Sequence, residues 1–203
     1  MKTDNKIYKK YKLNNKGFSL LELLIVIAIM VVVSVSTMVG ISVISKGNAK
    51  KVNKNLYSSL SYLKTTSMSK TGDWHMEIKK ENGQYLIETY KTTTSKDAEG
   101  NEITNTALVD SYKCSASKIS ITYNPRQKDS ASGVSSVNIA DTSMIVKFSK
   151  SDGSCSELKA GEEVLTDSGK YGNNGEFVVK VKGSKKEYKT TLWYKTGRVT
   201  TEN

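Results

Sequence analysis

The chain has 203 residues, with 31 Lys or Arg against 20 Asp or Glu and a formal net charge of +11. A length of about 200 residues fits one domain or one domain with an extension, and 37% apolar with 25% charged residues excludes a wholly disordered chain. Two cysteines and one histidine exclude a zinc site built from four such ligands and a scaffold held by several disulfides.

The chain begins with a basic leader, residues 1–17. It carries six lysines against the single Asp4, so its side chains sum to 6 − 1 = +5. Positive charge ahead of an apolar segment stays in the cytoplasm, and the part of the chain that follows the segment is exported.

An uncharged block follows the leader. Residues 23–45 are 23 consecutive positions without a charge, and as an α-helix they span about 35 Å against about 30 Å of bilayer hydrocarbon. The apolar region of a secretory signal is shorter, about 7 to 15 residues, and ends in a small-residue cleavage site. We therefore expect residues 18–45 to form the membrane-spanning and assembly half of a long helix.

The start of this block carries a recognisable motif. Residues 16–29 read KGFSLLELLIVIAI, and this order of Gly, Phe, Ser, two aliphatic residues, Glu and an aliphatic run resembles the processing and methylation segment of type IV pilins and type II secretion pseudopilins. The resemblance implies that a prepilin peptidase cuts between Gly17 and Phe18, leaving 203 − 17 = 186 residues, and methylates the new amine of Phe18. It also implies that Glu22 is needed for assembly.

The same resemblance implies partners and a location. The partners are other pilin or pseudopilin subunits, the prepilin peptidase and an inner membrane assembly platform, and no cofactor is expected. The protein would first span the cytoplasmic membrane once, with its N-terminus in the cytoplasm, and then enter a filament at the cell surface. Major pilins usually have a Pro in the membrane helix, whereas the single Pro of this chain is Pro125.

Glu22 is a charge at the edge of an apolar segment. An ionised carboxylate in a membrane helix costs on the order of 2.5 to 3.5 kcal/mol at the helix centre and less near an end. One interpretation is a Glu that reaches the membrane surface or is protonated. The other is a dedicated cation, because Phe18 and Glu22 share a helix face and cleavage creates an ammonium at Phe18. At about 4 Å and an effective dielectric constant of about 20, that pair attracts by about 4 kcal/mol. By the resemblance, the ammonium belongs to a neighbouring subunit.

Residues 46–72 are amphipathic. Apolar residues recur at helical spacing with lysines on the other faces: Ala49, Val52, Leu56, Leu60 and Leu63. This spacing predicts one helix from about residue 19 to about residue 70, ended by Thr71-Gly72-Asp73.

Residues 73–203 predict an antiparallel β head, so the fold class is α+β, with the long N-terminal helix packed on an antiparallel sheet. The expected strands are 74–80, 84–91, 107–113, 118–123, 143–149, 176–182, 186–194 and 198–201. Turn signals separate several of them, such as Glu81-Asn82-Gly83. The last two strands resemble the C-terminal hairpin of H-type minor pseudopilins. The polar segments 92–106, 124–142 and 159–175 are expected to be loops.

Few residues of the head suggest chemistry. Cys114 and Cys155 would lie outside the cytoplasm, where a disulfide is permitted, but their spacing alone leaves a disulfide and two free thiols equally open. Residues 97–102 alternate oxygen ligands as a calcium loop does, yet their Gly stands at the fourth rather than the sixth position, which favours a hairpin turn and no metal site. His75 is the single histidine, so a catalytic pair is poorly supported and we expect no enzyme.

The charge of the head leaves a further alternative. Beyond residue 45 there are 25 basic and 18 acidic residues, a net of +7, which favours polyanions such as DNA or teichoic acids. The lysines alternate with acids, however, which indicates a solvated surface. The sequence therefore predicts a structural subunit of a type IV pilus or pseudopilus. A competence-type DNA-binding pilin and an uncleaved, signal-anchored β-domain acting as a sensor or adhesin remain as alternatives, and a secretion, adhesion or competence system is not distinguished.

Overall fold

The computed structural model describes residues 19–127, 136–166 and 171–202, and only the backbone of residues 35–42. The chain divides into two compact units, Met1–Ser42 and Val43–Asn203. Antiparallel strands make up most of the second unit, which confirms the α+β class with a helix packed on antiparallel sheets.

The helix α1 (Leu20–Ser69) agrees with the predicted range of about 19–70. It ends where Gly72 adopts a φ of 95°, a left-handed conformation that glycine tolerates best. Across the residues that the structure describes, no helix combines the length and the apolar character needed to cross a membrane.

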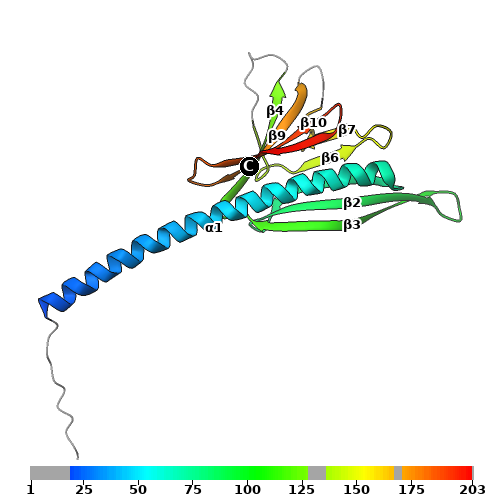
Figure 1. Ribbon diagram of the computed structural model, residues 1–203. Helices are drawn as coiled ribbons and strands as arrows, with labels where there is room; N and C mark the ends of the chain where they lie inside the picture. The colour runs from blue at the N-terminus through cyan, green and yellow to red at the C-terminus, as the bar shows by residue number, and fades with distance from the viewer. Residues whose placement is uncertain (1–18, 128–135, 167–170, 203) are drawn as a thin grey trace, which may run out of the picture. The chain divides into compact units, whose positions relative to one another are not determined.

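The head contains two antiparallel sheets (Figure 1). The first has the order β3-β2-β1-β6-β7-β8, with β1 (Asp73–Glu81), β2 (Gln84–Lys96), β3 (Glu102–Ser115), β6 (Met144–Phe148), β7 (Cys155–Ala160) and β8 (Glu163–Val164). The second has the order β11-β10-β9-β4-β5, with β4 (Ile119–Gln127), β5 (Val137–Asn138), β9 (Tyr171–Val181), β10 (Glu187–Trp193) and β11 (Arg198–Glu202).

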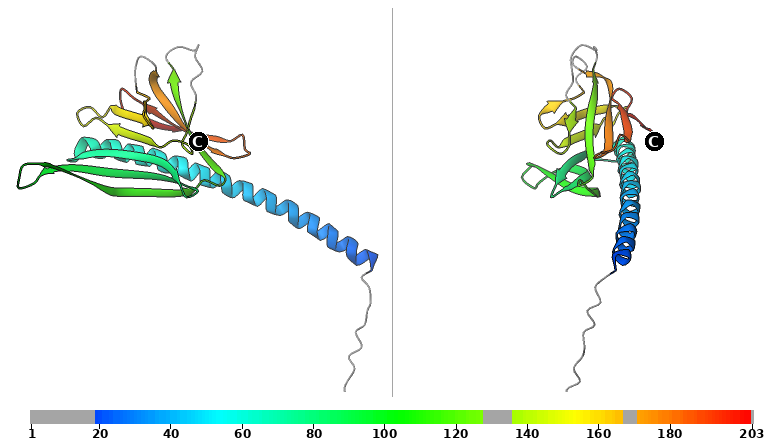
Figure 2. Two further views of the ribbon diagram at one scale, coloured as in Figure 1. Left: turned by 180° about the vertical axis from the view of Figure 1, so that it is seen from behind. Right: turned by 90° about the vertical axis from the view of Figure 1, so that its left-hand side faces the viewer.

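The predicted apolar stripe of α1 forms the centre of the head. Its five members are each 1% exposed or less and join residues of both sheets in one hydrophobic cluster: Ala49, Val52, Leu56, Leu60 and Leu63. In Figure 1 and in the left-hand view of Figure 2, this part of α1 is seen between the β2–β3 hairpin and strands β6, β9 and β10. The helix is thus the element on which both sheets pack.

Hydrogen bonds also join the elements inside this core. Asn53 of α1 donates to Thr201 Oγ1 and accepts from Thr190 Oγ1, each at 2.9 Å. The hydroxyls of Tyr123 on β4 and Tyr194 after β10 are hydrogen-bonded to each other. A Cβ at Gly175 would stand 2.0 Å from the Tyr123 hydroxyl oxygen, so only a glycine fits beside this pair.

The eight predicted strands are present, and the turn at Asn82-Gly83 joins β1 to β2 as expected, with positive φ at both residues. Three short strands, β5, β7 and β8, were not predicted. The prediction of a loop at residues 92–106 was wrong, because most of these residues extend β2 and β3. Neither face of that hairpin end is buried, so its sequence lacks the alternation of apolar and polar residues that marks a strand.

Candidate functional site

The first turn of α1 contains a reciprocal pair of hydrogen bonds. The main-chain N–H of Ser19 donates to Glu22 Oε2 at 2.9 Å, and the main-chain N–H of Glu22 donates to Ser19 Oγ at 3.1 Å. This is a capping box, in which two N–H groups without a helical partner are satisfied by side chains. The Ser-x-x-Glu spacing of this box is present in the sequence, but the interpretations of Glu22 given above, a carboxylate that reaches the membrane surface or is protonated and one paired with an ammonium, did not include a cap.

The helix surface after this cap is apolar and open. Leu20 is 81% exposed, and the large apolar residues from Leu21 to Val33 are 45% to 67% exposed. Large apolar side chains are seldom exposed in such a contiguous run unless a partner or a membrane covers them.

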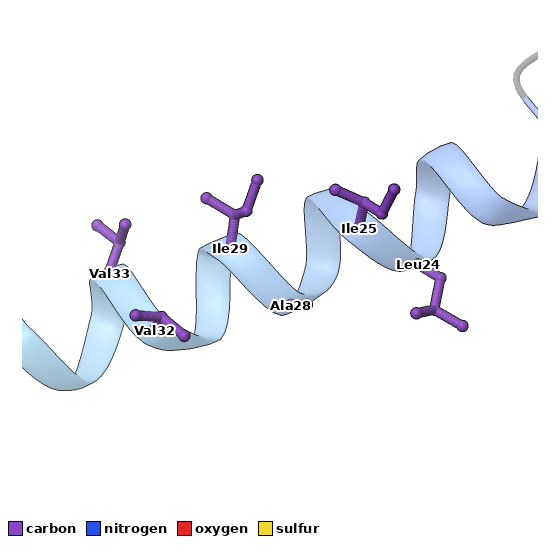
Figure 3. Close-up of a pocket in the computed structure, with 6 residues that line it drawn as sticks. All are labelled: Leu24, Ile25, Ala28, Ile29, Val32 and Val33. Atoms are coloured by element: carbon purple, nitrogen blue, oxygen red, sulfur yellow. The ribbon is translucent and has the colours of Figure 1, made fainter.

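The side chains of this surface form ridges and a groove of the kind by which helices pack together. A shallow groove is lined by residues that are three or four positions apart: Leu24, Ile25, Ala28, Ile29, Val32 and Val33. Figure 3 shows Ile25, Ile29 and Val33 as one row of side chains, with the small Ala28 leaving a gap in the neighbouring row. Rows at spacings of four form the ridges and grooves by which helices interlock. The arrangement can therefore receive a second helix.

Gly17 and Phe18, the expected cleavage and methylation positions, lie outside the residues that the structure describes. Glu22 is described and exposed, and it lies in the first turn of α1 among the exposed apolar residues. The capping bond involves one carboxylate oxygen, and a carboxylate offers about four acceptor positions on its two oxygens. Glu22 can cap the helix and still accept a hydrogen bond from a cation.

The two cysteines are free thiols and do not form the disulfide considered above. Cys114 lies on β3 and Cys155 on β7, and three strands separate β3 from β7 in the sheet. At about 4.8 Å per strand the two strands are roughly 19 Å apart along the sheet, whereas a disulfide needs Cα atoms within about 7 Å. Burial raises the pKa of Cys114 to about 11 and that of Cys155 to about 12, so both are poor nucleophiles.

Asp97 lies in the turn that joins β2 to β3. Its carboxylate accepts the main-chain N–H groups of Glu99 at 3.0 Å and Asn101 at 2.7 Å, and the Asn101 side-chain amide at 3.1 Å. These hydrogen bonds, that of the Asn101 amide foremost, lower the pKa of Asp97. The prediction of a hairpin turn at residues 97–102 is confirmed, and the carboxylate serves the turn itself.

His75 lies on β1, where its ring stacks on Tyr90 with centroids 5.2 Å apart and an angle of 14° between the planes. Burial and, secondly, the nearby Lys147 ammonium lower the pKa of His75. This stacking on Tyr90 of the neighbouring strand β2 gives His75 a role in packing. Glu88 of β2 was not singled out in the sequence. This nearly buried carboxylate accepts a hydrogen bond from the Tyr90 hydroxyl at 2.8 Å and pairs with Lys79 at 3.3 Å.

Several lysines of the strands are paired with carboxylates. Glu157 of β7 binds both Lys147, at 2.6 Å, and Lys159, and Lys180 pairs with Glu187 at 2.8 Å. Lys147 stands opposite Glu157, and Lys180 opposite Glu187, on neighbouring strands. These pairs reduce the positive field that these strands offer to a polyanion.

Comparison with known families assigns the N-terminal segment. Residues 12–45 match the family described as the prokaryotic N-terminal methylation motif, which is the prepilin-type segment of type IV pilins and pseudopilins. The chain therefore carries a pilin-type methylation motif, and the resemblance seen in residues 16–29 is confirmed. No curated protein and no solved structure matches the chain significantly.

Proposed function

We propose that the chain is the precursor of a structural subunit of a type IV pilus or pseudopilus, cleaved after Gly17 and assembled through its N-terminal helix. The observation that carries the proposal is the methylation motif at residues 12–45. The exposed apolar surface of α1, which lies within this segment, supports the same function, because a filament subunit needs a helix surface that other subunits cover. Pilin-type proteins of this motif are structural rather than enzymatic.

The proposal includes a membrane stage before assembly. Residues 23–45 carry no charge and the leader carries +5, a combination that favours insertion in the cytoplasmic membrane with the leader inside. Removal of the leader lowers the side-chain charge of the chain from +11 to +6. In the filament, the apolar surface then exchanges lipid for the helices of neighbouring subunits.

Glu22 has a specific part in this assembly. Cleavage gives Phe18 a methylated ammonium, and the ammonium of one subunit would pair with Glu22 of its neighbour. A buried ion pair contributes more to specificity than to stability, so the pair would define the axial register of the growing filament.

Mass analysis of the N-terminus of the exported protein tests the proposal. We expect a chain that begins with N-methyl-Phe18, and an intact leader on a protein assembled at the surface would refute the proposal in favour of a signal-anchored β-domain. The variant Glu22→Val should be inserted and cleaved like the wild type but incorporated poorly into filaments. Normal incorporation would show that the carboxylate is dispensable.

A further inference from the structure

Strand β3 is a long edge of the first sheet that carries no proline and, between residues 103 and 112, no lysine. It runs from Glu102 to Ser115 and, within the described chain, pairs with β2 alone. Three large apolar residues on it are open to solvent: Ile103 at 51%, Leu108 at 53% and Val109 at 44% exposed. Edge strands are normally short or carry lysines and prolines that prevent further pairing. Among residues 103–112, the sole charged side chain is that of Asp110.

The outer part of the same hairpin lacks a covering layer. Residues 93–96 of β2 and 102–106 of β3 are exposed on both faces, and β1 pairs with β2 only up to Thr92. In Figure 1 and in the left-hand view of Figure 2, the hairpin extends past the C-terminal end of α1. A two-stranded ribbon is marginally stable by itself, so a third strand along β3 would support it.

We infer that β3 pairs antiparallel with β3 of a second copy of this chain. The other described edge strands are short, with five residues in β11 and two each in β5 and β8. Among the described edge strands, another β3 is thus the one that matches β3 in length. Such a contact uses the same surface on both copies and closes as a pair. The inference goes beyond the proposed function and does not depend on it.

The charges of β3 select the register of this pair. When Glu102 of one copy stands opposite Lys113 of the other, residues 102–113 of both strands overlap and two opposite-charge pairs form. Registers that oppose Asp110 to itself or to Glu102 bring like charges together, which is unfavourable. Exposed ion pairs add little affinity but favour one alignment over others.

A bulge in β3 makes this register geometrically consistent. Tyr90 pairs with Leu108 and Thr89 with Asp110, so Val109 is an extra residue. Because of it, Glu102 and Lys113 lie on one face of the sheet although their numbers differ by an odd count. Residues that face each other across an antiparallel pair share a face, as this register requires. The uncovered end of each hairpin would then lie beside the part of its partner that packs on the core.

Paired cysteines test the register directly. Thr104 and Ser111 stand opposite each other in this register, yet within one strand they are seven residues apart, roughly 20 Å, too far for a disulfide inside one chain. In the full chain in detergent, we expect the double variant Thr104→Cys/Ser111→Cys to form a disulfide-linked dimer, at about ten times the level of either single variant. Equal dimer in the single variants, or none in the double variant, would overturn the register.

Charge exchange tests the contact without cysteines. We expect Glu102→Lys and Lys113→Glu to lower the dimer fraction in sedimentation of the full chain, and the double exchange to restore it. Leu108→Lys should also lower it, whereas Thr94→Lys, on the other strand of the ribbon, should not. Circular dichroism checks that each variant is folded. A chain that is always monomeric, a dimer unaffected by Leu108→Lys, or cross-links to a different protein would each refute pairing between copies.

Discussion

Ser19 and Glu22 satisfy each other's main-chain N–H groups at the start of α1, with donor–acceptor distances of 2.9 and 3.1 Å. The carboxylate proposed to receive a neighbour's ammonium is therefore already oriented by the helix to which it belongs. Glutamine can take the same place in a capping box, but it cannot form an ion pair. The two roles of Glu22 can consequently be separated by substitution.

We expect Glu22→Gln to retain the helix start and to lose assembly, and Ser19→Ala to do the reverse. Loss of a cap costs about 1 kcal/mol, which corresponds to about fivefold faster amide exchange in the first turn. Hydrogen exchange and filament incorporation, measured on both variants, give the comparison. If Glu22→Gln assembles normally, the charge has no part in assembly.

The space at Gly175 leads to a prediction for stability. A Cβ there would meet Tyr123 Oη at 2.0 Å and Tyr194 Oη at 2.6 Å, so Gly175→Ala should lower the free energy of unfolding by about 3 kcal/mol. The cost should be smaller in a Tyr123→Phe background, because the nearer oxygen is gone. Gly47→Ala is the matched control: it lies in α1 with no atom within 4 Å of its Cβ and should stabilise by about 1 kcal/mol. Urea unfolding measures all four variants.

Asn53 links α1 to the second sheet, and its loss should be costly. It is 1% exposed and Thr190 is 0% exposed, so Asn53→Ala leaves a buried hydroxyl without its partner and should cost about 2 to 3 kcal/mol. Asn48→Ala, at an exposed position of the same helix, should cost less than about 0.5 kcal/mol. A double-mutant cycle with Thr190→Val should give a coupling of about 1 kcal/mol. Additive effects would mean that the bond contributes nothing specific.

Local patterns in the sequence predicted much of this molecule. The stripe from Ala49 to Leu63 is buried as its spacing indicates, and Asn82-Gly83 turns the chain where expected. The motif around Gly17 lies within 14 consecutive residues, 16–29. Each of these signals depends on neighbours within a few positions, which is the range that a sequence pattern reports.

The features that were missed depend on contacts between distant segments. Strand β1 pairs with β6, and this nonlocal order separates Cys114 from Cys155; no spacing in the sequence reveals it. The outer end of the β2–β3 hairpin is exposed on both faces, so its mostly polar strands do not show the alternation of apolar and polar residues that predicts a strand. The capping role of Glu22 depends on the local Ser-x-x-Glu spacing and was therefore predictable from the sequence. The prediction considered instead how a charge is compensated in an apolar segment.

Glu88 should make the stability of the head depend on acid. Its burial works against ionisation, but hydrogen bonds from Tyr90 and the interactions with Lys79 outweigh it and lower the pKa of Glu88. A carboxylate with a lowered pKa in the folded state stabilises the fold above its unfolded pKa of about 4.3 and loses that contribution as the pH falls through the folded pKa.

The wild type should therefore lose more stability between pH 7 and pH 3 than Glu88→Gln does, as measured by urea midpoints at several pH values. Tyr90→Phe provides a graded control, because it keeps the carboxylate and removes one donor, so its acid dependence should lie between the other two. An identical pH dependence in all three proteins would show that Glu88 is not linked to folding. A steeper dependence in Glu88→Gln would mean that the pKa of Glu88 is raised rather than lowered in the folded head.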